Sequence, residues 1–72
     1  MATKAEKREL AGRIVKARDR IGITDAELAR RLDVPRSQVH DWVHGIHQPN
    51  LSSLKQLAEV LDCEIAELLG AA

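Results

Sequence analysis

The sequence lacks phenylalanine and tyrosine and contains one tryptophan and one cysteine. A single cysteine excludes a disulfide within the chain, which is typical of a protein in a reducing compartment such as the cytoplasm. No apolar run approaches the roughly 20 residues that cross a bilayer. A secretory signal would have an apolar stretch after its charged N-terminus, and this sequence has none there. We therefore expect a cytoplasmic protein that makes no contact with a membrane.

An excess of charge of one sign is also absent, because the formal net charge is zero. This argues against a strong generic nucleic-acid binder. The charges are nevertheless unevenly placed. Residues 1–20 hold seven basic against three acidic residues, residues 21–50 three against four, and residues 51–72 one against four. A dipolar domain can present a positive face to phosphates; the alternative is a set of merely solvated helix faces.

The chain is short, and its 72 residues suffice for one domain at most, which we expect to span residues 1–72. A core of this size is marginally stable without a disulfide, a metal or a partner subunit. Apolar residues make up 44% of the chain, which is enough for it to fold rather than stay disordered.

Apolar residues recur at helical spacing in five segments, and no strand pattern lies between them. The first segment runs from about Lys4 to Ile21. It begins within a short basic stretch at residues 1–9. Its inward face consists of Leu10, Ile14, Ala17 and Ile21. Gly22 ends this helix, as glycine commonly does at the position after a last turn. The final segment is a short helix from Ile65 to Leu69.

Clear start and stop signals delimit the second and third helices. Thr24 and Glu27 form a capping box, in which each side chain accepts a hydrogen bond from the other residue's backbone amide. The second helix ends near Asp33, because aspartate tolerates the left-handed conformation of such a corner. Pro35 presets the start of the third helix, and Gly45 ends it.

A fourth helix begins after Asn50, which is a favourable N-cap residue. Its predicted apolar stripe consists of Leu51, Leu54, Leu57, Ala58 and Leu61. The sequence ELARRLDV at residues 27–34 resembles QLAEVLDC at residues 56–63. We therefore expect two similar helix–corner–helix junctions, with Cys63 filling the second corner.

The stretch from Thr24 to Gly45 has the organisation of a helix-turn-helix, in which a tight corner joins two short helices. Its predicted structural core consists of Leu28, Ala29, Leu32, Val34, Val39, Trp42 and Gly45. The outward positions of its second helix are polar: Arg36, Ser37, His40, Asp41 and His44. Side chains of this kind are long enough to reach base edges in DNA.

The pattern Thr-x-x-Glu-Leu-Ala-x-x-Leu-x-Val-x-x-x-x-Val-x-x-Trp-x-x-Gly-x-x-x-Pro runs from Thr24 to Pro49. It resembles the lambda-repressor-like, Cro-type (XRE) helix-turn-helix family, as does Leu-x-x-Leu-x-x-Leu-Ala-x-x-Leu from Leu51. The resemblance covers residues 10–69. It implies an all-α domain of five helices that binds double-stranded DNA, commonly as a homodimer on a palindromic operator. It further implies a transcription regulator, here a bacterial or phage repressor, with no cofactor and no small-molecule substrate.

The resemblance also assigns roles to single residues. The expected base-reading residues, on the second helix of the motif, are Arg36, Ser37, His40 and Asp41. The expected DNA-backbone contacts are Thr24, Arg18, His44, His47 and Gln48. Among them, Arg36 could bind the O6 and N7 atoms of guanine together. Asp41 could accept from a cytosine amine or orient a neighbouring side chain.

The chain departs from the family pattern at four positions. Asp25 stands where a glutamine often holds a phosphate, so that contact is expected to be lost through repulsion. Asp33 replaces the usual corner glycine, and Pro35 replaces a capping serine or threonine. Val43 replaces a glutamate that pairs with an arginine of the first helix. We therefore expect Arg18, the arginine at that place, to be free for DNA or solvent.

Other functions are weaker readings of the same residues. His40 and His44 lie four apart with His47 close behind, a spacing that suits a transition metal, but a zinc site would need a further ligand; we predict no metal. We predict no enzyme, because there is no glycine-rich phosphate loop, no evident base partner for Cys63 and no pocket large enough for a substrate. The main alternative is a protein-interaction module on the same fold, of the antitoxin or antirepressor type.

A homodimer is expected on two grounds: a single copy offers a small DNA footprint, and two copies would match two half-sites. The candidate dimer contacts are the apolar residues near the end of the chain: Ile65, Leu68 and Leu69. Some of them must instead cover the core.

Overall fold

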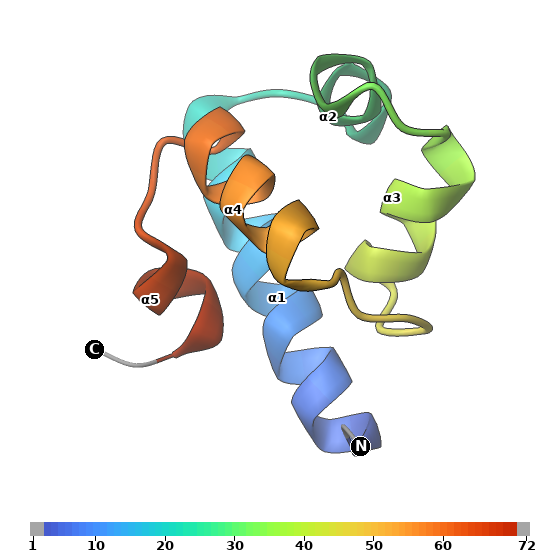
Figure 1. The fold of residues 1–72 in the computed structure, drawn as a ribbon, viewed down its shortest axis with the longest axis vertical. Coiled ribbons are helices and arrows are strands. Elements are labelled where there is room, and N and C mark those ends of the chain that lie inside the picture. The colour runs from blue at the N-terminus through green and yellow to red at the C-terminus, as the bar shows by residue number, and fades with distance from the viewer. Residues whose placement is uncertain (1–2, 71–72) are drawn as a thin grey trace.

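The computed structural model describes residues 3–70, which form five helices and no strand (Figure 1). The helices are α1 (Lys4–Ile21), α2 (Asp25–Leu32), α3 (Arg36–Val43), α4 (Leu51–Val60) and α5 (Ile65–Leu69). The predicted all-α, five-helix class is confirmed. From Lys4 onward the basic stretch at residues 1–9 forms the first turns of α1; residues 1 and 2 lie outside the described part.

The helix ends follow the local signals of the sequence, with one correction. Gly22 ends α1 in the left-handed conformation at φ 72°, as expected. Thr24 Oγ1 accepts a hydrogen bond from the Glu27 amide at 3.1 Å, but the reciprocal half of the predicted capping box is not formed. The Glu27 carboxylate turns instead to Arg30 and Arg31. The complete capping box lies at Thr3 and Glu6, at the start of α1.

The two predicted corner junctions share one geometry. Asp33 and Asp62 are the described non-glycine residues with positive φ, at 56° and 54°. After each of them the next amide bonds back to a small residue of the preceding helix: Val34 N to Ala29 O at 3.0 Å and Cys63 N to Ala58 O at 2.9 Å. The internal sequence similarity therefore reflects a corner that is used twice.

Replacing Asp33 by glycine is expected to stabilise the protein by about 0.5–1 kcal/mol. The left-handed conformation costs an L-residue roughly 1–2 kcal/mol, and the larger backbone entropy of glycine in the unfolded chain cancels part of that gain. The free energy of unfolding in urea checks this. Asp33→Ala is the control: it removes the same carboxylate but keeps the Cβ, so it should destabilise. Equal stability of the two variants would contradict the explanation.

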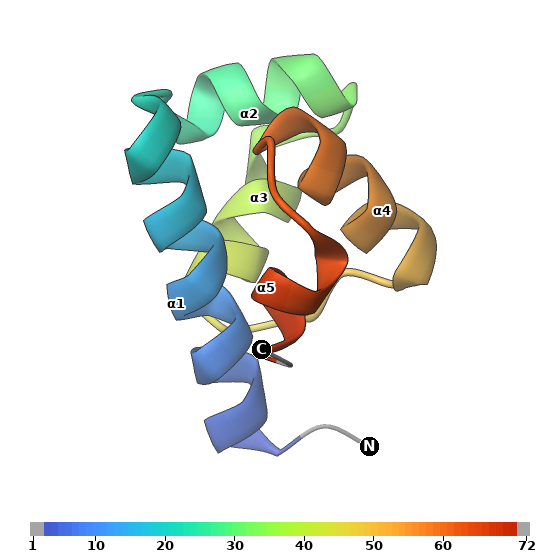
Figure 2. The same cartoon turned by 90° about the vertical axis from the view of Figure 1, so that its left-hand side faces the viewer.

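The core fills the space enclosed by all five helices. α1 packs against α3 and α5, α2 packs against α3 and α4, and α4 packs against α5. The buried apolar side chains are Leu10, Ala11, Ile14, Ala17, Leu28, Ala29, Leu32, Val39, Trp42, Leu54, Leu57, Ala58, Leu61 and Leu68. Val34 and Cys63 are half-buried against them. α3 and α5 lie on opposite sides of the molecule (Figures 1 and 2).

The prediction that Leu51 belongs to the apolar stripe of α4 is wrong, because its side chain is 61% exposed. Leu51 is the first residue of α4, and the buried position at this end of the helix is taken by Pro49. The predicted Asn50 cap is confirmed, with Asn50 Oδ1 accepting from the Ser53 amide at 2.8 Å. Of the three candidate dimer residues, Leu68 is in the core, Ile65 is half-buried and Leu69 is exposed.

Candidate nucleic-acid interface

One face of α3 is buried and apolar, and the other is exposed and polar. Val39 and Trp42, three residues apart, are buried and fix the helix against the core. The predicted base-reading residues Arg36, Ser37 and His40 are exposed on the same helix, while Asp41 is half-buried. Gln38, which the sequence analysis did not single out, is also exposed here. Its position next to Ser37, in the first turn of α3, is the feature of the sequence that could have identified it as a candidate.

The Asp41 carboxylate lies between two histidines. Its Oδ2 is 3.3 Å from His47 Nδ1, and its Oδ1 is 3.5 Å from His40 Nδ1. The rings of His40 and His44 are 4.2 Å apart between centroids. In the free protein the Asp41 carboxylate therefore lies within 3.5 Å of two histidines. A contact of Asp41 with a base stays a prediction.

The loop after α3 folds back on the end of that helix. The amides of Ile46 and His47 donate to the Asp41 carbonyl oxygen at 2.9 and 3.3 Å. Gly45 makes this turn possible with φ 70°, in the left-handed region that favours glycine. A Cβ at Gly45 would contact Arg8 at 3.5 Å, so the N-terminal part of α1 lies beside this loop. His47 and Gln48 are exposed in it.

Arg18 is not free, and the expectation that it would be is wrong. Its Nη1 binds Asp25 Oδ1, and its Nη2 binds Asp19 Oδ1 at 2.8 Å. The hydrogen bond to Asp19, opposed by partial burial and supported by Asp25, raises the pKa of Arg18 above its ordinary value. The physical reason for the error is that Asp25 replaces the missing glutamate as a partner for the arginine. The pair also links the last turn of α1 to the first turn of α2.

A second charged cluster covers α2. The Glu27 carboxylate accepts hydrogen bonds from Arg30 and from Arg31, whose Nε lies 2.8 Å away. These arginines lower the pKa of Glu27 to about 2, with Arg30 the larger cause. Both arginines are exposed and were not among the predicted contacts, although a basic pair at the end of α2 was visible in the sequence. Thr24, at the start of α2, uses its hydroxyl as a helix cap.

The Glu27 cluster predicts a pH-dependent stability difference. Because the pKa of Glu27 falls from 4.5 to about 2 on folding, its stabilising contribution is complete above about pH 4.5 and is lost as the pH falls towards 2. Glu27→Gln should therefore lower the urea midpoint at pH 7. The difference from wild type should shrink between pH 4.5 and pH 2. A difference that stays constant over that range would contradict the pairing.

The described residues do not assemble a metal site. Within residues 3–70, no group of three or more histidine, cysteine, aspartate or glutamate residues is arranged to hold a metal ion. Burial, the largest cause, raises the pKa of the Cys63 thiol, which disfavours the thiolate form that acts as a nucleophile. No helix in this part of the chain is long and apolar enough to cross a membrane.

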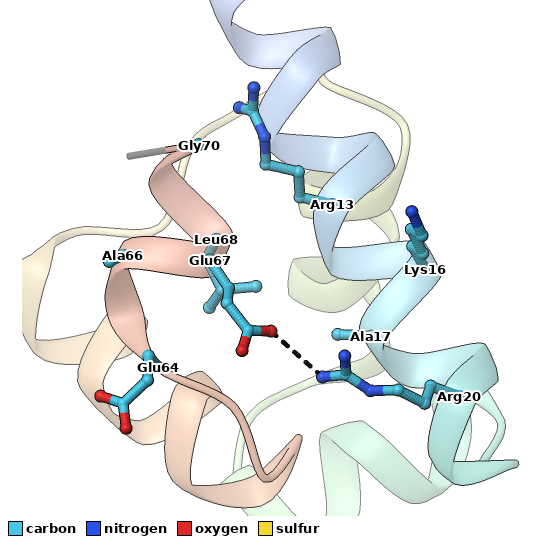
Figure 3. Close-up of a pocket in the computed structure, with 9 residues that line it drawn as sticks. All are labelled: Arg13, Lys16, Ala17, Arg20, Glu64, Ala66, Glu67, Leu68 and Gly70. Atoms are coloured by element: carbon cyan, nitrogen blue, oxygen red, sulfur yellow. Dashed lines mark hydrogen bonds and ion pairs between the residues drawn. The ribbon is translucent and has the colours of Figure 1, made fainter. Parts of the chain in front are cut away.

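One surface feature was not predicted from the sequence. A groove of about 520 Å³ lies between α1 and α5 (Figure 3). It is remote from α3 and therefore from the predicted DNA-reading residues.

A sequence model described as helix-turn-helix matches residues 14–68, which is most of the chain and includes both helices of the motif. The chain belongs to the lambda-repressor-like helix-turn-helix family. This family consists of DNA-binding regulators. No curated protein and no solved structure was found to be similar to the chain.

Proposed function

We propose that this helix-turn-helix protein is a sequence-specific transcriptional repressor that reads its operator with α3. The observation that carries the proposal is the division of α3 into two faces. Val39 and Trp42 are buried and hold the helix in place. Arg36, Ser37 and His40 form an exposed polar surface of the kind that hydrogen-bonds to base edges in the major groove.

Arg36 is the main candidate for base recognition. It is the first residue of α3, and an arginine at the start of a recognition helix can donate two hydrogen bonds to guanine. Ser37, His40 and Asp41 would contact neighbouring base pairs. His40 and His47 lie beside the Asp41 carboxylate. In a complex with DNA, Asp41 would therefore contact a base together with these two histidines.

The DNA backbone would be held on both sides of α3. On one side, Thr24 and the first amides of α2 would meet a phosphate. On the other side lie the exposed residues His44, His47 and Gln48. Arg18 would contribute only by exchanging its carboxylate partners for a phosphate, because Asp19 and Asp25 occupy it in the free protein.

We further propose that two copies bind a palindromic operator in the cytoplasm of a bacterium or of a phage-infected cell. A symmetric pair would place two α3 helices on half-sites about one helical turn apart. No cofactor takes part in this mechanism, which is the occupancy of a promoter site.

The protein-interaction alternative is favoured by one observation. The carboxylate of Asp25 lies at the N-terminus of α2, where it would repel a phosphate, and it holds Arg18 in an ion pair. Salt separates the two functions. DNA affinity that depends on phosphate neutralisation falls steeply with salt concentration, whereas an apolar protein interface is much less sensitive.

The proposed function is tested by selecting bound duplexes from a random DNA pool at low salt. Enrichment of a palindrome would support it. Failure to enrich any sequence, with the protein shown to be folded by circular dichroism, would favour the protein-interaction alternative.

Replacing Asp25 by asparagine should increase DNA affinity several-fold and steepen the salt dependence by about one phosphate contact. The change removes a charge that repels phosphate and releases Arg18. Loss of the ion pair should lower the free energy of unfolding by less than about 1 kcal/mol, because the pair is partly exposed. Affinity at several salt concentrations checks the first expectation. Glu59→Gln on α4 is the matched control; an equal gain there would mean that only net charge matters.

A further inference from the structure

One face of α1 carries basic residues at both of its ends. Spacings of four and three residues place the following positions on this single face: Lys4, Arg8, Ala11, Val15 and Arg18. Ala11, in the middle, is buried. At the C-terminal end of the face, Arg18 binds Asp25 at the start of α2. The face is therefore the one that borders the helix-turn-helix motif.

The N-terminal end of this face lies beside the loop that follows α3. A Cβ at Gly45 would be 3.5 Å from backbone and side-chain atoms of Arg8. The same loop carries His47 and Gln48, which are exposed and are expected contacts of the DNA backbone. The first turns of α1 reach beyond this loop and beyond the other helices (Figures 1 and 2). Lys4 and Arg8 therefore lie at the edge of the surface that is proposed to meet DNA.

The two cations at this end have no acidic partner in the free protein. Lys4 and Arg8 are exposed, and neither forms an ion pair or a side-chain hydrogen bond within residues 3–70. The neighbouring carboxylates are engaged elsewhere, because Glu6 caps the start of α1 and Glu9 lies 3.9 Å from Arg13. A phosphate can therefore bind Lys4 or Arg8 without displacing another group.

The length of the face matches the width of the major groove. Arg8 and Arg18 are ten residues apart, which corresponds to about 15 Å along a helix axis. The major groove of B-DNA is about 12 Å wide, and a phosphate backbone borders it on each side. With α3 in the groove, Arg18 would be close to the backbone that meets the start of α2. Arg8 would be close to the backbone that meets the loop after α3.

We propose that the first two turns of α1 belong to the DNA interface, with Arg8 and Lys4 binding phosphates of the backbone beside the loop after α3. This role rests on the proposed function, since it requires α3 in the major groove. Arg8 binds the phosphate nearest the loop, and Lys4, one turn farther out, binds a phosphate beyond it. These contacts give a chain of zero net charge a local attraction for DNA.

The salt dependence of DNA affinity tests this role. Arg8→Gln should lower the slope of log affinity against log salt by about one and weaken binding about five- to tenfold at about 0.1 M salt. Adding Lys4→Gln should lower the slope by about one more. The loss should be equal for the selected operator and a scrambled duplex, because phosphates carry no sequence information. Arg8→Lys keeps the charge and should keep the wild-type slope.

The matched control is Lys16→Gln, which removes one exposed charge from another face of the same helix. That face, with Arg13, Lys16 and Arg20, lines the groove towards α5 (Figure 3). α5 and α3 lie on opposite sides of the molecule (Figures 1 and 2), so the slope for Lys16→Gln should equal that of the wild type. Circular dichroism should show the same helix content in all variants.

Ethylation interference locates the contacts on the DNA, because an ethylated phosphate has lost its charge. Ethylation of the phosphates beside the loop after α3 should block binding of the wild type. In Arg8→Gln the interference should disappear at one of these phosphates. It should remain at the phosphates that meet the start of α2, near Thr24 and Arg18.

The outcomes separate the role of α1 from the proposed function. If the wild type binds DNA and Arg8→Gln has the same slope and the same interference pattern, the role of α1 is overturned and the proposed function stands. An equal fall of the slope in Lys16→Gln would also overturn it, because total charge alone would then account for the loss. If the wild type binds no duplex, the proposed function and the role of α1 are both overturned.

Discussion

Replacing Arg36 by alanine is expected to reduce affinity for the selected operator by about 10- to 100-fold. A bidentate arginine–guanine contact is worth about 1–3 kcal/mol of discrimination against a wrong base. Arg36 is exposed at the first position of α3, so its removal leaves the core untouched. Quantitative band-shift measurements against the selected duplex check the loss. Repeating the selection with the variant should show relaxed preference at one base pair of each half-site.

The control for this experiment is Lys55→Ala, which removes a positive charge from the exposed surface of α4. It should change affinity only slightly and equally for all sequences, because a generic charge carries no sequence information. If Arg36→Ala instead weakens binding to every duplex by the same factor, then Arg36 contacts a phosphate, and base recognition passes to Ser37 and His40.

Replacing Leu57 by alanine is expected to destabilise the fold by about 2–5 kcal/mol. Leu57 is completely buried on α4, and a leucine-to-alanine change in a core combines lost burial with a cavity. A small domain has only a few kcal/mol of stability in total, so a large fraction of the variant should be unfolded at room temperature. Thermal and urea unfolding followed by circular dichroism at 222 nm measure the loss.

Leu51→Ala is the matched control, since it makes the same chemical change on the same helix at a side chain that is mostly exposed. Its effect should stay within about 0.5 kcal/mol. Comparable losses in both variants would show that Leu51 is covered in solution, for example by a second copy of the chain.

Local signals explain why the helices could be predicted from the sequence. Gly22 and Asp33 end helices through their own backbone conformation, and Asn50 begins one through its own side chain. Each signal acts within a few residues, so it can be recognised without knowledge of the fold. The internal similarity of residues 27–34 and 56–63 predicted even the shared geometry of two corners.

The partners of charged side chains could not be predicted in the same way. Arg18 pairs with Asp25 seven residues away, and Glu27 chooses two arginines of its own helix over the cap of α2. A long side chain can reach several oppositely charged groups at similar cost, and the fold decides which of them is close. The family pattern has the partner of this arginine at position 43, so the sequence analysis did not consider Asp25 as a partner of Arg18.

The groove between α1 and α5 was missed for a related reason. It arises where two helices far apart in the sequence meet, and its three cations look like an ordinary solvated face when α1 is considered alone. Leu51 was assigned to the core because it continues the apolar spacing of α4. The spacing of apolar residues along one helix does not show how far the neighbouring helices extend, and therefore which end of the stripe they leave exposed.

The two faces of α3 have a consequence for how such proteins diversify. The buried residues that hold α3 are Val39 and Trp42, and neither belongs to the exposed surface that would contact bases. Exchange of exposed side chains on a helix usually changes stability by less than about 0.5 kcal/mol. Substitutions at Arg36, Ser37 and His40 can therefore accumulate without loss of the scaffold. A gene duplicate could acquire a new target sequence in single steps, each of which leaves a folded protein.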